Sequence, residues 1–373
     1  MLICTAPNKG PTANGREMTA MCRFAARILC KLLVGVALAI LLAHLCFDTT
    51  RLRHATYDAL FVNLTSLVQA PAAADTEKPS LKPKTTPAVT NIPNDVLSDG
   101  NRSNLTAENI CPLIPPNLVG YIPTKMDVAS IEAVEDEFPD VMMGGRFRPK
   151  NCTSRHRVAI LIPYRDRAEH LKIFIYNIHR VLARQQVDYG VFVIEQGDQE
   201  KFNRAKLLNV GYLESTALYD YQCFVFHDID LVPADDRNIY TCPQQPRHMS
   251  VRIDYRSGVP YTLMFGGVSS LNKEHMLLVN GFSNLYWGWG GEDDDISFRL
   301  KHFNLTILRR PAEIARYTSL RHVKNKPSPE RHKILAKWKD RYKTDGLNSV
   351  KYKIMDIQFK KLYTWIVVDL RES

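Results

Sequence analysis

The chain has 373 residues, of which 45% are hydrophobic and 24% are charged. This is the composition of a folded soluble protein, and the length allows one large α/β domain with appended segments. The formal net charge of +10 raises the question of nucleic acid, but the sequence shows no basic–aromatic repeat and no nucleic-acid-binding module. Nucleic acid is therefore not an expected partner.

The N-terminal part of the chain has the pattern of a membrane anchor. Residues 1–31 are basic, and residues 32–47 form an apolar run. A run of this length is short for a membrane span and could be the core of a cleaved signal peptide. Because no small-residue cleavage site follows it, we expect a signal-anchor transmembrane helix with a cytosolic tail, which gives a single-pass type II membrane protein.

Residues 48–108 are expected to form a disordered stem. Prolines are scattered among small and polar residues, and few large apolar residues follow Val68. Such a segment cannot bury enough apolar surface to offset the entropy lost on ordering. In a luminal protein, Asn-x-Ser/Thr sequons are candidate glycosylation sites. The five sequons begin at Asn63, Asn101, Asn104, Asn151 and Asn304.

Residues 109–373 alternate between strand and helix patterns, which predicts a mostly parallel sheet of the kind that binds nucleotides. The strand patterns cover 157–163, 189–194, 223–226 and 261–268, and the helical patterns cover 169–182 and 202–213.

Four cysteines of this domain suit disulfides in an oxidising compartment. They are Cys111, Cys152, Cys223 and Cys242. Their spacing leaves three pairings open. A zinc site is the competing interpretation, but no Cys-x-x-Cys spacing supports it.

Two carboxylates follow the strand pattern that begins at Cys223. The apolar run ends in Asp228-Ile229-Asp230, so both acids would lie at the carboxyl end of a strand, where open α/β sheets bind ligands. Hard oxygen ligands there suit a divalent ion that bridges phosphates. Asp-x-Asp alone is a weak signal, and its combination with the downstream tract described next is much more specific.

The tract Trp287–Asp295 reads Trp-Gly-Trp-Gly-Gly-Glu-Asp-Asp-Asp. Indoles offer flat faces that stack on sugar rings, and glycines let the backbone move or approach a ligand closely. Four acids in a row are costly unless a metal, a hydroxyl or a proton transfer uses them. The alternatives are a solvated acidic turn and a pair of core tryptophans.

These motifs resemble those of the β-1,4-galactosyltransferases, inverting Golgi enzymes with an α/β fold of the GT-A type. Six motifs between about residues 109 and 358 carry the likeness. They are Ile162–Arg167, Phe202–Asn209, Asp228–Asp230, Phe265–Val268, Trp287–Asp295 and Asp345–Asn348. The resemblance implies a luminal catalytic domain at 109–373 and a Golgi membrane location. It also favours the disulfides Cys111–Cys152 and Cys223–Cys242.

The resemblance implies Mn²⁺ as the cofactor, with Asp230 and His322 as its ligands. Mn²⁺ accepts mixed oxygen and imidazole ligation. Ser319 departs from the family pattern, because vertebrate members place a methionine sulfur ligand at this position. A hydroxyl is a harder ligand, so the preference for Mn²⁺ over Mg²⁺ would be less strict.

The reaction implied is displacement at the anomeric carbon of a UDP-sugar by an acceptor hydroxyl. Asp293 would be the base, with Glu292 and Asp294 positioning the acceptor, and like-charged neighbours should raise the pKa of the base. The choice of Asp293 comes from the family match, since spacing cannot decide it. The expected donor-binding residues are Pro163, Tyr164, Arg165, Arg167, Arg204 and Asp228, with Arg256 as a further candidate in a segment shorter than the family's.

Trp289, followed by Gly290, would be a mobile indole that closes over the donor. The basic stretch from His322 to about Trp338 resembles the family's long flexible loop, which closes after donor and metal bind. The expected acceptor contacts in this stretch are Arg331 and Leu335, beside His332, where an aromatic is familiar.

Met264 stands where family enzymes restricted to galactose carry a tyrosine, and relatives with a smaller aliphatic residue accept an N-acetyl group. Methionine is flexible enough to make room for it. We therefore expect transfer of N-acetylgalactosamine, galactose or both from a UDP-sugar to the 4-OH of a terminal β-linked N-acetylglucosamine. The alternatives are a strict β-1,4-galactosyltransferase, a non-catalytic carbohydrate-binding relative, and a metal-dependent nucleotide-sugar hydrolase.

Overall fold

The computed structural model describes residues 109–254, 260–323 and 325–371. The expected tail, anchor and stem lie outside these residues, as do Asn63, Asn101, Asn104 and Arg256. Among the described residues, no helix is both long and apolar enough to cross a membrane. The two sequon asparagines within the described ranges, Asn151 and Asn304, are exposed.

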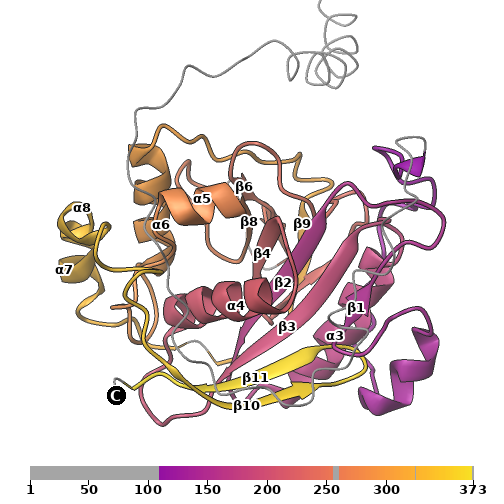
Figure 1. Ribbon diagram of the computed structural model, residues 1–373, viewed down its shortest axis with the longest axis horizontal. Coiled ribbons are helices and arrows are strands. Elements are labelled where there is room, and N and C mark those ends of the chain that lie inside the picture. The colour runs from indigo at the N-terminus through magenta and orange to yellow at the C-terminus, as the bar shows by residue number, and fades with distance from the viewer. Residues whose placement is uncertain (1–108, 255–259, 324, 372–373) are drawn as a thin grey trace, which may run out of the picture. The chain divides into compact units, whose positions relative to one another are not determined.

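A mixed sheet of eight strands forms the centre of the described domain (Figure 1). Seven strands follow the order β10–β11–β3–β2–β4–β8–β6, and β1 pairs with the start of β3. The bounds are β1 Arg146–Phe147, β2 Arg157–Tyr164, β3 Asp188–Gln196, β4 Cys223–His227, β6 Arg247–His248, β8 Val268–Asn272, β10 Lys353–Phe359 and β11 Thr364–Asp369. A smaller sheet has the order β5–β9–β7, with β5 Leu231–Pro233, β7 Arg252–Ile253 and β9 Arg316–Ser319.

The prediction of a mostly parallel sheet is correct only for its centre. Strands β11, β3, β2 and β4 run parallel, whereas β1, β6, β8 and β10 pair antiparallel with their neighbours. The antiparallel pairing of β4 with β8 sets His227 opposite Val268. The residues just before β8 therefore lie at the carboxyl end of β4, beside the Asp228-x-Asp230 turn.

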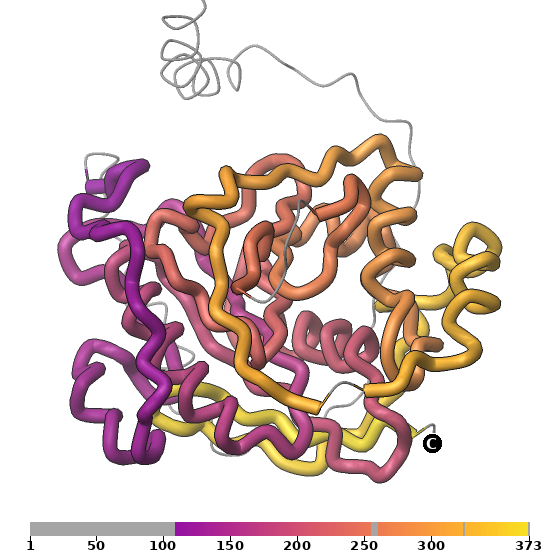
Figure 2. Tube along the Cα trace, turned by 180° about the vertical axis from the view of Figure 1, so that it is seen from behind, coloured from indigo at the N-terminus to yellow at the C-terminus, as the bar shows by residue number. Residues whose placement is uncertain are grey.

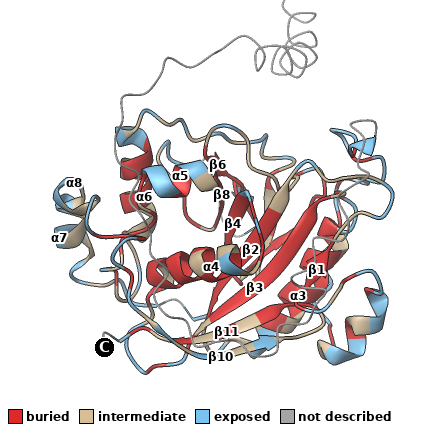
Figure 3. Ribbon diagram, viewed as in Figure 1, coloured by how far each residue is buried: buried red, intermediate tan, exposed pale blue. Residues whose placement is uncertain are grey.

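The central strands are covered on both faces, which explains their nearly continuous apolar sequences. In β2, Val158, Ile160 and Ile162 pack on the side of helix α3, and Ala159 and Leu161 pack on the side of helix α4. These strands are buried along their length (Figure 3). The helices are α3 Ala168–Leu182, α4 Arg204–Leu218, α5 Lys273–Leu278, α6 Glu292–His302, α7 Arg331–Ala336 and α8 Trp338–Arg341, with a 3₁₀-helix at Glu132–Glu137.

Residues near the start of the described domain lie beside its last strands (Figure 2). The backbone N–H of Gly144 donates to the Lys360 carbonyl at 2.6 Å, and that of Gly145 donates to the Lys361 carbonyl at 3.2 Å. Gly145 has a φ of +70°, and a Cβ there would clash with the Leu362 carbonyl. This close approach of two backbones requires glycine.

The predicted strand over residues 261–268 is wrong except at its last residue. The Met264 N–H donates to the Tyr261 carbonyl at 2.9 Å, which forms a turn. Gly267 has a φ of +80°, so a regular strand can begin only at Val268. The apolar residues of this segment, among them the buried Phe265, therefore belong to a turn and not to a strand.

Both predicted disulfides are confirmed. Cys111 bonds to Cys152, and Cys223 bonds to Cys242, with Cα–Cα distances of 4.8 and 5.4 Å. These distances lie in the usual range for disulfides.

A buried histidine far from the acidic motifs makes folding sensitive to acid. The His179 imidazole is fully buried, with Nδ1 2.8 Å from the Tyr189 hydroxyl and Nε2 2.8 Å from the Leu362 carbonyl. Burial lowers the pKa of His179 to about 4, and the contact with the Leu362 carbonyl opposes this only in part. The unfolded chain, with a histidine pKa of about 6.5, therefore binds more protons between these two values.

We expect the His179 contribution to stability to be complete above pH 6.5. It should fall by about 1.4 kcal/mol per pH unit as the pH drops toward the folded pKa. Urea unfolding at several pH values should show a smaller acid loss in His179→Gln than in the wild type. The exposed His302→Gln serves as control and should leave the slope unchanged. Equal slopes in the wild type and His179→Gln would contradict the assignment.

Candidate active site

Arg204 links the two acidic motifs. It is the first residue of α4; its Nε donates to Asp228 Oδ1 at 2.6 Å, and its Nη1 lies 3.6 Å from Glu292 Oε1. Asp228 is held at the end of β4, because its N–H donates to the Gly267 carbonyl at 3.0 Å. The two motifs that the sequence placed in one site therefore meet around a single guanidinium, a bridging contact that the sequence did not predict.

Asp230 and His322 also lie together, as predicted. Strand β5 pairs with β9 so that Leu231 faces Ser319, and the Leu320 N–H donates to the Asp230 carbonyl at 2.7 Å. This register brings His322 Nδ1 to 3.1 Å from Asp230 Oδ2. The smaller sheet thus positions the two side chains expected to bind a metal.

The donor set of this pair fits a Mn²⁺ site that substrate completes. Burial raises the pKa of Asp230 to about 6, and the negative charge of Asp228 adds to the effect, while His322 opposes it. Such a carboxylate gains from a nearby cation. Within the described ranges, no group of three or more His, Cys, Asp and Glu side chains could enclose a metal. Asp230 and His322 offer one oxygen and one nitrogen ligand, which leaves the remaining positions for phosphate oxygens and water.

Ser319 lies next to this pair, and its backbone fixes its position. Its backbone N–H donates to Asp254 Oδ1 at 3.0 Å, and its backbone pairs with Leu231. The less strict preference for Mn²⁺ over Mg²⁺ expected from Ser319 stays a prediction.

The acids of the Trp–Gly tract form the first turn of α6. Gly291 precedes the helix with a φ of +98°, and Glu292–Asp295 follow it. Carboxylates in the first turn are stabilised by the helix dipole and by backbone N–H groups that have no partner inside the helix. The local fold thus explains how four adjacent acids can be tolerated.

One of the four acids has a structural role that the sequence did not reveal. Asp295 is fully buried, with Oδ1 2.7 Å from Arg299 Nε in an equally buried ion pair. Its other oxygen accepts from the Tyr286 hydroxyl at 2.9 Å and from Arg341 Nη2 at 3.2 Å. With these partners, Asp295 holds α6 against the core and is not available for a ligand.

Glu292 and Asp293 have raised pKa values. Burial raises the pKa of Glu292 to about 7, helped by the charge of Asp293 and opposed by Arg204. Burial and the charge of Asp294 raise the pKa of Asp293, again opposed by Arg204. Glu292 Oε2 is buried without a hydrogen-bond partner among the described residues. Both groups have the properties of a general acid or base.

The turn before β8 contacts the acidic helix end directly. A Cβ added to Gly266 would clash with Asp293 Oδ2, so the carboxylate rests against the glycine backbone. The hydroxyl of Tyr261, a half-exposed residue that sequence reasoning did not single out, donates to Asp294 Oδ1 at 2.6 Å. Met264, half-buried, lies in the same turn. The turn therefore forms one wall of the site.

The two tryptophans of the tract differ. Trp287 is partly buried against the core and lies under Lys206, whose Nζ is 5.5 Å from the ring centroid. Trp289 is 55% exposed, and Arg331 Cζ lies 5.3 Å from its ring centroid. The Ser328 N–H donates to the Trp289 carbonyl at 2.9 Å. The predicted loop thus contacts the predicted mobile indole, and only Trp287 behaves as a core residue.

Four of the expected donor-binding residues lie at the end of β2 and in the turn between β2 and α3. Tyr164 is buried in the core, and both it and Pro163 lie within β2. Arg165 Nη1 donates to the Glu200 carbonyl at 2.7 Å. Arg167 precedes α3, with Nη1 3.3 Å from His170 Nδ1. Arg167 also lowers the pKa of Asp230, although less than His322 does, which indicates that this turn is close to the Asp230–His322 pair.

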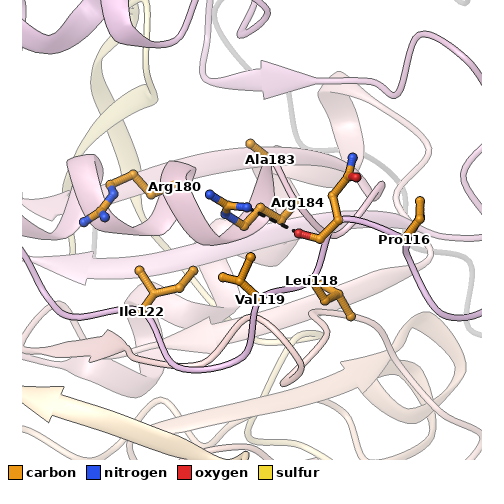
Figure 4. A pocket seen from close by; sticks show the side chains of 8 residues that line it. Pro116, Leu118, Val119, Ile122, Arg180, Ala183 and Arg184 are labelled. Atoms are coloured by element: carbon orange, nitrogen blue, oxygen red, sulfur yellow. Dashed lines mark hydrogen bonds between the residues drawn. The ribbon is translucent and has the colours of Figure 1, made fainter.

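A cavity of about 570 Å³ lies elsewhere on the domain (Figure 4). It lies between residues 116–122 and the last turns of α3, where Arg184 Nη1 donates to the Asn117 carbonyl at 3.3 Å. Because Arg167 marks the opposite end of α3, this cavity is separate from the acidic site.

Comparisons with known proteins identify the family of the chain. The family described as the N-terminal region of glycosyl transferase group 7 matches residues 111–243, and the one described as the N-terminal domain of galactosyltransferase matches residues 247–323. Beta-1,4-galactosyltransferase 1 of Mus musculus is 44% identical over 319 residues, which cover 81% of this chain and 80% of the relative. The chain belongs to the β-1,4-galactosyltransferase family.

Other members of the β-1,4-galactosyltransferase family give the same result. Beta-1,4-galactosyltransferase 1 of Homo sapiens is 47% identical over 286 residues, which cover 73% of this chain and 72% of the relative. The catalytic domain of Drosophila beta1,4galactosyltransferase 7, solved with xylobiose, is 29% identical with a TM-score of 0.52, covering 58% of this chain and 95% of that one. A mutant of the Drosophila protein was solved with manganese, UDP-Gal and xylobiose. The chain is a glycosyltransferase with an α/β fold of the GT-A type.

Proposed function

We propose that this protein is an inverting β-1,4-galactosyltransferase. It transfers galactose from UDP-galactose to the 4-OH of a terminal β-linked N-acetylglucosamine on glycoproteins or glycolipids. The relatives are named as galactosyltransferases, and the Drosophila structure contains UDP-Gal. This supports the strict galactosyltransferase, an alternative in the sequence analysis, over transfer of N-acetylgalactosamine.

The observation that carries the proposal is the Arg204 bridge between Asp228 and Glu292. It joins the turn expected to bind the donor to the helix end expected to bind the acceptor, so both substrates meet within one site. Asp293 takes the proton of the acceptor hydroxyl, and its raised pKa suits this task. Asp294 and Glu292 orient the acceptor, and Trp289 covers the donor and excludes water.

Manganese is the proposed cofactor, as in the Drosophila structure. Asp230 and His322 would hold it, and the ion would neutralise the diphosphate that leaves. Arg167, close to Asp230, adds positive charge on the protein side.

The proposal is tested with the detergent-solubilised full-length protein, UDP-galactose and a β-linked N-acetylglucosamine acceptor. We expect a disaccharide with a β-1,4 linkage, identified by NMR spectroscopy. Release of free galactose alone would indicate a hydrolase. Binding of UDP-galactose without any product would indicate a carbohydrate-binding relative.

In this proposal, Met264 controls how strongly UDP-galactose is preferred over UDP-N-acetylgalactosamine. A tyrosine there would fill space beside the C2 substituent of the donor sugar, whereas methionine can move aside. We expect Met264→Tyr to lower the kcat/KM ratio of UDP-N-acetylgalactosamine to UDP-galactose by about tenfold or more. Met264→Leu is the matched control and should keep the wild-type ratio. An unchanged ratio in Met264→Tyr would show that this side chain does not contact the C2 substituent.

The proposed location is the Golgi membrane, with residues 109–373 in the lumen. The apolar run at 32–47 and its basic flank support this orientation. The exposed sequons at Asn151 and Asn304 would then be available for glycosylation.

A further inference from the structure

Arg309 holds together the turn that forms the wall of the active site. The residue lies between α6 and β9, and its Nη2 donates to the carbonyls of Tyr261, Thr262 and Met264 at 3.2, 3.0 and 2.8 Å. Its Nε donates to His248 Nδ1 at 3.2 Å. One guanidinium reaches His248 through Nε and the three carbonyls through Nη2, a division between two donor groups that the single nitrogen of a lysine cannot reproduce.

The backbone just before Arg309 is fixed by two hydrogen bonds of Leu308. The Leu308 N–H donates to the Pro246 carbonyl at 2.8 Å, and the His248 N–H donates to the Leu308 carbonyl at 3.0 Å. Because His248 Nδ1 accepts from Arg309, Nε2 carries the proton and donates to the Gly266 carbonyl at 3.1 Å. Arg309 is therefore part of a rigid support that reaches both ends of the turn.

The same turn touches two carboxylates of α6. Tyr261 donates to Asp294, and Gly266 lies against the Asp293 carboxylate. Tyr261 is half-exposed, and its carbonyl accepts from both the Met264 N–H at 2.9 Å and Arg309 Nη2 at 3.2 Å. The position of the Asp294 carboxylate thus depends on a residue that contacts neither the acidic motif nor the expected substrates.

We propose that Arg309 is a positioning residue for sugar transfer. It acts through the Tyr261–Met264 turn on Asp294 and on the space beside the donor sugar. This proposal rests on the function proposed above. Removing it lets the turn move, which misplaces the Tyr261 hydroxyl and loosens the wall at Met264. Displacements of about 1 Å at reacting groups can cost up to about a hundredfold in rate.

The test is a double-mutant cycle on the full-length protein. Arg309→Met should lower kcat/KM for the acceptor by about ten- to hundredfold. In the Tyr261→Phe background the same substitution should cost only a few-fold, because the link to Asp294 is already broken. Arg309→Lys should recover part of the loss. The exposed Lys301→Met also removes one positive charge and should behave like the wild type.

Two readouts separate positioning from a general loss of stability. We expect Arg309→Met to bind UDP in the presence of Mn²⁺ as the wild type does, and to change the ratio of the two UDP-sugar donors. The proposal would be overturned if Arg309→Met lowered kcat/KM by the same factor in the wild type and in Tyr261→Phe. Full activity of Arg309→Met would overturn it as well. If Arg309→Met unfolds, the cycle is run with Arg309→Lys and the same criteria apply. Absence of transfer in the wild type would instead reject the proposed function.

Discussion

Asp293→Asn should lower kcat by about a hundredfold or more, because the amide cannot accept the proton of the acceptor hydroxyl. The substitution keeps the shape of the side chain against Gly266, so binding of UDP-galactose should persist. Burial and the charge of Asp294 raise the pKa of Asp293, and the group works only when deprotonated. Activity should therefore fall as the pH drops through that raised pKa. Steady-state kinetics at several pH values measure the loss of kcat and its pH dependence, and a titration with UDP-galactose measures donor binding.

Glu292→Gln is the matched control for the choice of base. Glu292 has a pKa of about 7 and could also accept a proton, but it lies beside Arg204, whereas Asp293 lies against a glycine backbone. We expect Glu292→Gln to weaken acceptor binding and to retain more turnover than Asp293→Asn. Near-normal turnover in Asp293→Asn together with its loss in Glu292→Gln would assign the base to Glu292.

Asp230→Ala should raise the Mn²⁺ concentration for half-maximal activity by about a hundredfold or more, because it removes the charged ligand from a site that has few protein ligands. His322→Ala removes a neutral ligand and should cost less. Direct Mn²⁺ binding, followed by electron paramagnetic resonance with UDP present, should weaken in the same order.

Asp254→Asn controls for nearby charge, since Asp254 binds the backbone of Ser319 rather than the proposed metal site. It should leave the Mn²⁺ titration close to that of the wild type. A His322→Ala protein with an unchanged titration would show that the segment after β9 supplies no ligand.

The sequence predicts best what depends on local pattern. Buried parallel strands have nearly continuous apolar sequences, so β2, β3 and β4 were found close to their observed bounds. Helix α4 begins at Arg204 rather than at Phe202, because the Asn203 side chain caps it by accepting from the Lys206 N–H at 2.9 Å.

Contacts between distant segments explain what the sequence could not predict. The turn before β8 has the composition of a strand, but Arg309, 45 residues after Met264, holds its carbonyls instead of a neighbouring strand. Asp295 looks like its three acidic neighbours until the fold sets Arg299 and Tyr286 beside it. The sheet is mixed rather than mostly parallel because β8 returns beside β4 in the opposite direction. In each case the structure is decided by a contact that the local periodicity of the sequence does not indicate.

The Cys223–Cys242 bond closes a covalent ring that contains β4, both acids of the Asp228-x-Asp230 turn and β5. Closing a ring of this size restricts the unfolded chain by about 3 kcal/mol in the chain-entropy description. The proposed metal-binding turn is therefore built on a segment whose ends are tied only after thiol oxidation. A copy of the chain kept in a reducing compartment would have every catalytic residue but would lack this restraint. An oxidising compartment is thus needed to give the metal-binding segment of the folded enzyme its covalent restraint.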